Sequence, residues 1–175
     1  MTETMTDDGA ARLLAEIHAA RGLLRAPAPA LRQSHAALWA HATREPGRPV
    51  DLAVERAIRG DPETARRYRT MLAAQALAHA PLALAASDGS LSSRRVGPFS
   101  LDILPAEPDA PPLLVLRGEG RMPRVIEAMR GDEAVRLDLG PPVDGTIVLA
   151  LDPAVPEADR LGRLLGDPAS AVFLL

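Results

Sequence analysis

The feature that most constrains the fold is the stretch of residues 135–151, which reads VRLDLGPPVDGTIVLAL. Apolar and charged side chains alternate over its first five residues, and apolar side chains alternate again between Ile147 and Leu151. A period of two places successive side chains on opposite faces of an extended chain. Both segments are therefore predicted to be strands with one face buried.

The residues between these two segments, 140–145, read GPPVDG. Proline removes a backbone donor and glycine allows positive φ, so the chain is expected to turn here. The loop is too long for a two-residue hairpin and suits a wider antiparallel connection. The last five residues, AVFLL, are predicted to form a buried strand. A predicted helix at 156–165 would bring the chain back to the sheet edge, where this last strand can pair.

The rest of the second half adds further strands. FSLDIL at 99–104 alternates in the same way, and Leu113–Leu116 is a short apolar run. Residues 122–130 fit two structures, because Pro123 favours the first turn of a short helix whereas Val125 and Ile126 favour a strand. The second half is thus predicted to hold a small, mainly antiparallel sheet with one or two helices.

The first half is predicted to be helical, with aspartate side chains accepting hydrogen bonds from the first-turn amides of three helices. Gly60 is expected at the position after a helix where a left-handed conformation is favoured. Pro62 follows a capping aspartate and suits the first position of the next helix. The expected helices run from Asp7 or Asp8 to about Leu24, from Ala30 to Thr43, from Asp51 to Arg59, and from Asp61 to His79.

These patterns predict an α+β fold: a helical N-terminal half and a C-terminal half with a small mainly antiparallel sheet plus one or two helices. The composition shifts near Ser87, so we expect a helical domain at 1–86, a linker at 87–97 and a sheet domain at 98–175. Residues 1–97 carry a net charge of +3 and residues 98–175 a net charge of −6. Opposite signs would favour docking of two modules.

Composition limits the chemistry. The chain contains no Cys, and its twenty basic residues are all Arg. Disulfides and thiolate metal sites are thereby excluded, as is a phosphate-binding loop that needs Lys. The four histidines lie on predicted helices, and His35 and His41 are six residues apart, which does not match a zinc-binding helix. No G-x-S-x-G motif occurs, and we expect no metal and no cofactor.

No apolar run reaches the ~20 residues of a membrane span. The first ten residues, MTETMTDDGA, lack the basic and apolar segments of a signal peptide. The expected protein is therefore cytoplasmic, with no membrane partner.

Residues 52–71 can be read as a helix-turn-helix, but Arg56 and Arg66 would then occupy interior positions that need small or apolar side chains. Few aromatic residues and a net charge of −3 also argue against nucleic-acid binding, so none is expected. Arg66, Arg67 and Arg69 are instead expected to line an exposed helix face and to bind a protein partner.

Residues 54–69, VERAIRGDPETARRYR, resemble a stretch of bacterial anti-sigma factors, in which a short helix is followed by a longer helix that opens with Asp-Pro. The resemblance extends over about residues 38–80. It implies a cytoplasmic regulator whose helices clasp a sigma factor. Many members of that family carry zinc ligands or a membrane span, and this chain has neither the Cys nor the apolar run for them.

The sequence as a whole favours a non-catalytic regulatory protein that acts through protein–protein interaction. Two alternatives remain open: an enzyme whose site is assembled from residues outside any known motif, and a structural subunit of a larger complex.

Overall fold

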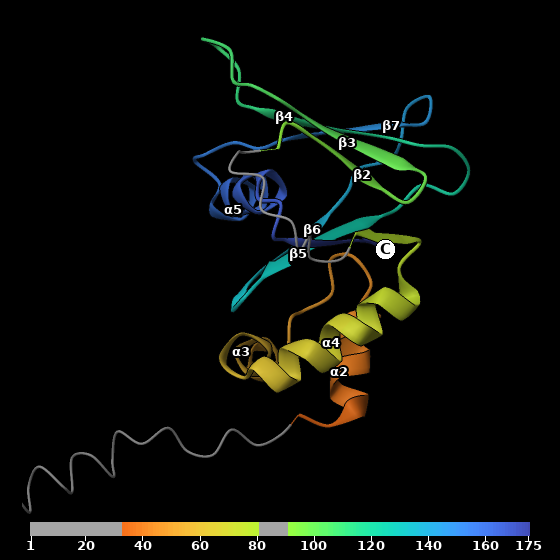
Figure 1. Cartoon of the computed structure of the whole chain (residues 1–175), viewed down its shortest axis with the longest axis vertical. Helices are drawn as coiled ribbons and strands as arrows, with labels where there is room; N and C mark the ends of the chain where they lie inside the picture. The colour runs from red at the N-terminus through yellow and green to blue at the C-terminus, as the bar shows by residue number, and fades with distance from the viewer. Residues whose placement is uncertain (1–32, 81–90) are drawn as a thin grey trace, which may run out of the picture. The chain divides into compact units, whose positions relative to one another are not determined.

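The computed structural model describes residues 33–80 and 91–175 (Figure 1). The helix expected between Asp7 or Asp8 and Leu24 lies outside the described residues. The helix expected from Ala30 to Thr43 begins only at His35, because Ser34 is extended and caps it by accepting from the amide of Ala37 at 3.1 Å. The helices of the described part are α2 (His35–Ala42), α3 (Leu52–Gly60), α4 (Pro62–Gln75) and α5 (Pro156–Gly166).

The helix starts follow the predicted capping chemistry. Asp51 Oδ1 accepts from the amides of Ala53 at 2.9 Å and Val54 at 3.3 Å. Asp61 accepts from the amides of residues 63 and 64 at 3.3 and 3.1 Å, and Pro62 occupies the first turn of α4. These side chains satisfy amides that have no partner within the helix, so the predicted starts of α3 and α4 are confirmed.

Two further details of the helical prediction were wrong. Gly60 does not adopt a left-handed conformation but is the last residue of α3. The following Asp61 is extended, with φ −128° and ψ 110°, because it ends α3 and caps α4 at once. Helix α4 ends at Gln75 rather than at His79, because residues 78–80 form a strand.

The strands form two antiparallel four-stranded sheets. Sheet A has the order β1 (Ala78–Ala80), β8 (Ala171–Leu174), β5 (Val125–Arg130) and β6 (Glu133–Asp138). Sheet B has the order β2 (Ser93–Val96), β3 (Phe99–Leu104), β4 (Leu113–Arg117) and β7 (Thr146–Ala150).

The predicted pairing of the two alternating segments was wrong. Both are strands, but β6 pairs with β5 in sheet A whereas β7 pairs with β4 in sheet B. The intervening loop carries the chain from one sheet to the other instead of closing a hairpin. Alternation determines which face of a strand is buried, but it does not determine which strand lies beside it.

The predicted terminal strand is confirmed, although not at the sheet edge. β8 pairs with β1 on one side and with β5 on the other, and all four of its residues are buried. The ambiguous segment at 122–130 contains a strand, β5. Residues 93–96, inside the stretch expected to be a linker, form β2.

Sheet A lies between two apolar cores (Figure 1). Helices α2, α3 and α4, here called the helical layer, cover one face and share a core with Met129, Ala171 and Phe173. Helix α5 and sheet B cover the other face, where Ile126, Val172 and others pack. A strand covered on both faces needs apolar residues at nearly every position, as β5 and β8 have.

The described residues thus show an α+β fold with four helices and two antiparallel sheets. None of these helices is long and apolar enough to cross a membrane.

Gly118, just after β4, provides a test of the packing on sheet B. A Cβ atom at this position would lie 2.2 Å from Phe99 Cδ1, and the Phe99 ring is buried. We expect Gly118→Ala to lower the free energy of unfolding by about 1–3 kcal/mol, as overpacking usually does. Urea denaturation measures the change.

Gly140→Ala is the matched control, because a Cβ atom there would meet nothing within 4 Å. Equal stability of the two variants would contradict the close packing of β4 on β3.

Candidate functional site

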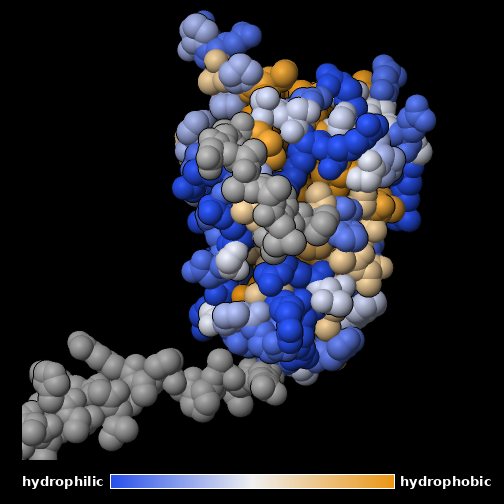
Figure 2. Space-filling model, in the orientation of Figure 1, coloured by the Kyte–Doolittle hydropathy of each residue, from blue (hydrophilic) through white to orange (hydrophobic). Residues whose placement is uncertain are grey.

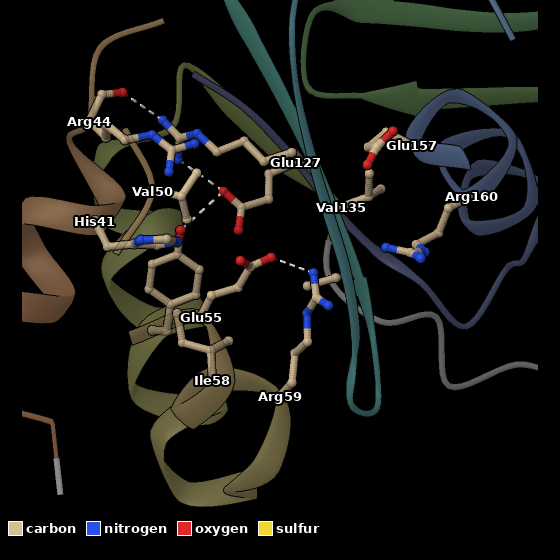
Figure 3. Close-up of a pocket in the computed structure, with 13 residues that line it drawn as sticks. His41, Arg44, Val50, Glu55, Ile58, Arg59, Glu127, Val135, Glu157 and Arg160 are labelled. Atoms are coloured by element: carbon tan, nitrogen blue, oxygen red, sulfur yellow. Dashed lines mark hydrogen bonds and ion pairs between the residues drawn. The ribbon is translucent and has the colours of Figure 1, made fainter. Parts of the chain in front are cut away.

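A pocket of about 270 Å³ lies between the helical layer and sheet A (Figure 3). Its walls combine charged groups with the apolar side chains of Val50, Ile58 and Val135. The pocket reaches around β6, one of the two edge strands of sheet A, to residues of α5. Its polar and charged lining residues are His41, Arg44, Glu55, Arg59, Tyr68, Glu127, Arg136, Glu157 and Arg160.

A buried ion pair lies at the inner wall of the pocket. Glu127 on β5 and Arg136 on β6 are directly opposite each other in the strand register. Arg136 Nη1 donates to Glu127 Oε2 at 3.0 Å, and the two side chains are only 10% and 4% exposed. Tyr68 of α4 donates its hydroxyl to the same oxygen at 3.1 Å. The carboxylate therefore joins both strands to the helical layer.

Arg136 makes a second connection to the helical layer. Its Nη1 donates to the carbonyl oxygen of Ala42 at 3.3 Å, and its Nη2 to that of Arg44 at 3.0 Å. Ala42 is the last residue of α2. The free carbonyls at a helix end carry partial negative charge, so a guanidinium there stabilises the helix terminus.

Burial dominates the protonation behaviour of this network. Desolvation raises the pKa of Glu127, while Arg136 and Tyr68 act in the opposite direction. Burial also raises the pKa of Tyr68 far above its ordinary value, with the charge of Glu127 adding to the effect. Tyr68 is thus a neutral hydroxyl donor at physiological pH.

His41 lies beside this network on the last turn of α2. Its side chain is buried, and its ring centroid is 5.4 Å from that of Tyr68. Burial and the neighbouring charges of Arg44 and Arg136 lower the pKa of His41 to about 4. The imidazole is therefore neutral near pH 7, and its Nδ1 atom is buried without a hydrogen-bond partner in the described part of the chain.

Three further basic residues surround the opening, and two of them have acidic partners. Arg59 bonds to Glu55 within α3, and Arg160 Nε lies 3.7 Å from Glu133 Oε1. Arg44 differs, since its Nη1 atom is buried without a hydrogen-bond partner among the residues that the structure describes. In Figure 3, Arg44 and His41 lie on the same side of Glu127, whereas Glu157 and Arg160 lie beyond the strands.

The residue types in the pocket suit hydrogen bonding to a polar ligand better than metal coordination. Within residues 33–80 and 91–175, no three His, Asp or Glu side chains converge as metal ligands would. Glu127 Oε2 is engaged by two donors, which favours a structural role for this carboxylate over proton transfer.

The structure places the three arginines predicted to bind a partner on α4, outside the pocket lining. Arg66 is exposed and pairs with Glu63, with its Nη2 atom 2.9 and 2.6 Å from the two carboxylate oxygens. Arg67 is partly buried and donates to the carbonyl oxygen of Gln33 at 3.4 Å. Arg69 is partly buried. Arg67 is thus directed toward the start of α2.

Sequence reasoning missed the pocket. Glu127 is an acidic residue within the apolar run VIEAM, and a charge in a fully buried strand usually has a partner. That signal was available but did not identify the partner. His41 was weighed as a metal ligand against a histidine of the helix surface or core, and Arg136 was read only as the solvent-facing residue of an alternating strand.

The pH dependence of stability tests the environment of His41. Its folded-state pKa of about 4 lies below the ordinary value of 6.5, so the unfolded chain binds more protons between these values. Stability should therefore fall as the pH drops from about 6.5 to about 4. The full pKa shift corresponds to a loss of roughly 3 kcal/mol in the free energy of unfolding, and solvent screening makes the loss smaller.

Glu127 acts in the opposite direction, because its raised pKa favours the folded state at low pH. The comparison is therefore made between the wild type and His41→Asn by urea denaturation at pH 7 and pH 4.5. The wild type should lose more stability than the variant over this interval. An equal loss in both proteins would mean that His41 is not held neutral by burial.

Comparison with known proteins leaves the site to be interpreted from its own geometry: no family model, no curated protein and no solved structure matches the chain.

Proposed function

We propose that the protein is a non-catalytic regulatory protein that acts in the cytoplasm and whose helical N-terminal half binds a protein partner. The observation that carries the proposal is the exposure of Trp39 on α2. Leu38 and Ala42 of the same helix are buried, yet Trp39 is 45% exposed, so α2 presents apolar side chains to the core and to solvent. A helix that is apolar on both sides is usually covered on both sides.

Nearby positions in the sequence support a binding role for the helical layer. Val50 and Leu52, which precede and begin α3, are 42% and 60% exposed. Tryptophan is the residue type most enriched among the energetically dominant contacts of protein interfaces, and arginine is also enriched there. The expected partner-binding residues Arg66, Arg67 and Arg69 lie in the same layer, on α4.

On the face shown in Figure 2, the surface over the helical layer is mostly hydrophilic. An apolar anchor surrounded by polar side chains is the usual arrangement of a reversible protein interface. The resemblance to anti-sigma factors makes a sigma factor the specific partner that we propose.

The experiment is affinity capture from the source cells, with bound proteins identified by mass spectrometry, for the wild type and three variants. Trp39→Ala should weaken binding of the partner by about tenfold or more, as loss of a dominant interface side chain does. Arg66→Gln combined with Arg69→Gln should weaken it to a smaller extent. Val148→Ala removes a 57%-exposed side chain of sheet B and should bind normally.

Thermal melts separate binding from folding. Trp39 and Val148 are 45% and 57% exposed, so neither substitution should change the melting midpoint greatly. If Trp39→Ala captures the same proteins as the wild type, the helical layer is not the binding surface. Capture of a protein other than a sigma factor, lost in Trp39→Ala, would support the interface and refute the proposed partner.

A further inference from the structure

Two residues that line the pocket beneath the helical layer each have a buried polar atom with no hydrogen-bond partner within residues 33–80 and 91–175: His41 Nδ1 and Arg44 Nη1. Buried polar groups in folded proteins are nearly always paired with protein, water or ligand atoms. His41 is only 9% exposed, so its imidazole is not simply turned toward bulk solvent. Both atoms belong to residues that line the same cavity.

Three acidic side chains in or beside the pocket already have basic partners, whereas Asp51, whose charge also acts on His41, caps α3. Glu127 binds Arg136, Glu55 binds Arg59, and Glu133 lies beside Arg160. The remaining acid of the lining, Glu157, lies on α5 beyond the strands in Figure 3. Arg44 is thus a partly buried guanidinium that forms no ion pair among the described residues, although its charge lowers the pKa of Glu127, which already binds Arg136.

The geometry points to a ligand site: we propose that this pocket binds a small molecule through an oxyanion, a carboxylate or a phosphate, which accepts from Arg44 beside His41. A guanidinium group presents donors in a planar fork that matches such oxygens. Because His41 is neutral near pH 7, Arg44 supplies the charge and the imidazole supplies a neutral hydrogen-bonding group.

The cavity limits the size and character of the ligand. Its volume of about 270 Å³ is just below the ~300–1,000 Å³ that ligand pockets typically measure, so only a small ligand fits. Val50, Ile58 and Val135 provide apolar wall around the charged groups. A short aliphatic body attached to the oxyanion would bury apolar surface there. This ligand site goes beyond the proposed partner binding and does not depend on it.

The test uses the full-length chain and three probes: acetate, butyrate and inorganic phosphate, each titrated against sodium chloride at constant ionic strength. The readout is the imidazole resonances of the protein labelled at histidine, with those of His41 assigned from the His41→Asn variant. We expect a saturable shift of the His41 resonances. A stronger response to butyrate than to acetate would identify the ligand as a carboxylate with an aliphatic body. A stronger response to phosphate than to either carboxylate would identify the ligand as a phosphate.

Arg44→Gln removes the charge but keeps a hydrogen-bonding side chain. It should weaken binding of the effective probe by about 10- to 100-fold, the usual result of losing a charge-assisted hydrogen bond. Arg48→Gln is the matched control, because Arg48 lies four residues further along, pairs loosely with Glu45 and has a side chain 72% exposed. This variant should bind as the wild type does.

The titration of the wild type decides the question even if Arg44→Gln fails to fold. The absence of a saturable His41 shift with all three probes would overturn the proposal and leave water as the occupant of the pocket. Equally weakened probe binding in Arg44→Gln and Arg48→Gln would also overturn the proposal, because binding would then depend only on the overall surface charge.

Discussion

Arg136→Met should lower the free energy of unfolding by about 3–5 kcal/mol, the usual result of leaving a buried charge without its partner. Glu127 is nearly inaccessible to solvent, and the substitution removes the guanidinium that binds its carboxylate at 3.0 Å. It also removes two hydrogen bonds to carbonyl oxygens at the end of α2. Urea denaturation followed by circular dichroism measures the loss.

Arg117→Met is the matched control. Arg117 also pairs with an acid on a neighbouring strand, Asp102, at 2.9 Å, but its side chain is 55% exposed. Exposed ion pairs contribute about 0–1 kcal/mol, so this variant should stay close to the wild type. Similar losses in both variants would show that the Glu127–Arg136 pair is not isolated from solvent.

The double variant Glu127→Met with Arg136→Met distinguishes the cost of an unpaired charge from the loss of packing. If the unpaired Glu127 carboxylate causes the loss, removing both charges should restore part of the stability. Further destabilisation would instead mean that the connections of Arg136 to the end of α2 dominate.

Removal of residues 171–175 should unfold the protein. β8 lies between β1 and β5, so its loss separates sheet A into two parts. Val172, Phe173 and Leu174 are buried, and burial of each such side chain stabilises by roughly 1.5–3 kcal/mol. Their sum is comparable with the ~5–15 kcal/mol by which a domain is usually stable. Thermal melts should show no cooperative transition, and aggregation is expected.

A point substitution gives a graded version of the same test. Phe173→Ala should cost about 3–5 kcal/mol, because the ring is buried in the core shared with the helical layer. Val148→Ala and a deletion of residues 1–5 serve as controls that should leave the melt unchanged. A deletion of 171–175 that melts like the full-length protein would contradict the buried position of β8.

Local signals in the sequence were sufficient for the starts of α3, α4 and α5 and for the existence of most strands. Asp51 and Asp61 cap helices because their carboxylates reach amides only two or three residues away. The alternation at 135–139 and the apolar run at 171–175 likewise reflect the burial of each segment itself. These properties depend on consecutive residues, which is why they could be predicted.

Short strands gave no comparable signal. β1 has three residues and continues what had been read as a helix, and β2 lies within a stretch read as a linker. Each is extended because a neighbouring strand supplies its hydrogen bonds, β8 for the first and β3 for the second. Tertiary pairing overrides weak local preference in such segments.

By itself, the sequence determined where most helices begin, which segments are extended and that the chain end is buried. Only the tertiary structure decided that the strands on either side of residues 140–145 belong to different sheets. It also brought His41, Arg44, Tyr68 and Glu127 together around one pocket. Capping and alternation depend on near neighbours in the chain. Strand partners and the pocket depend on contacts between residues tens of positions apart. Such contacts form only when the whole chain folds around its core.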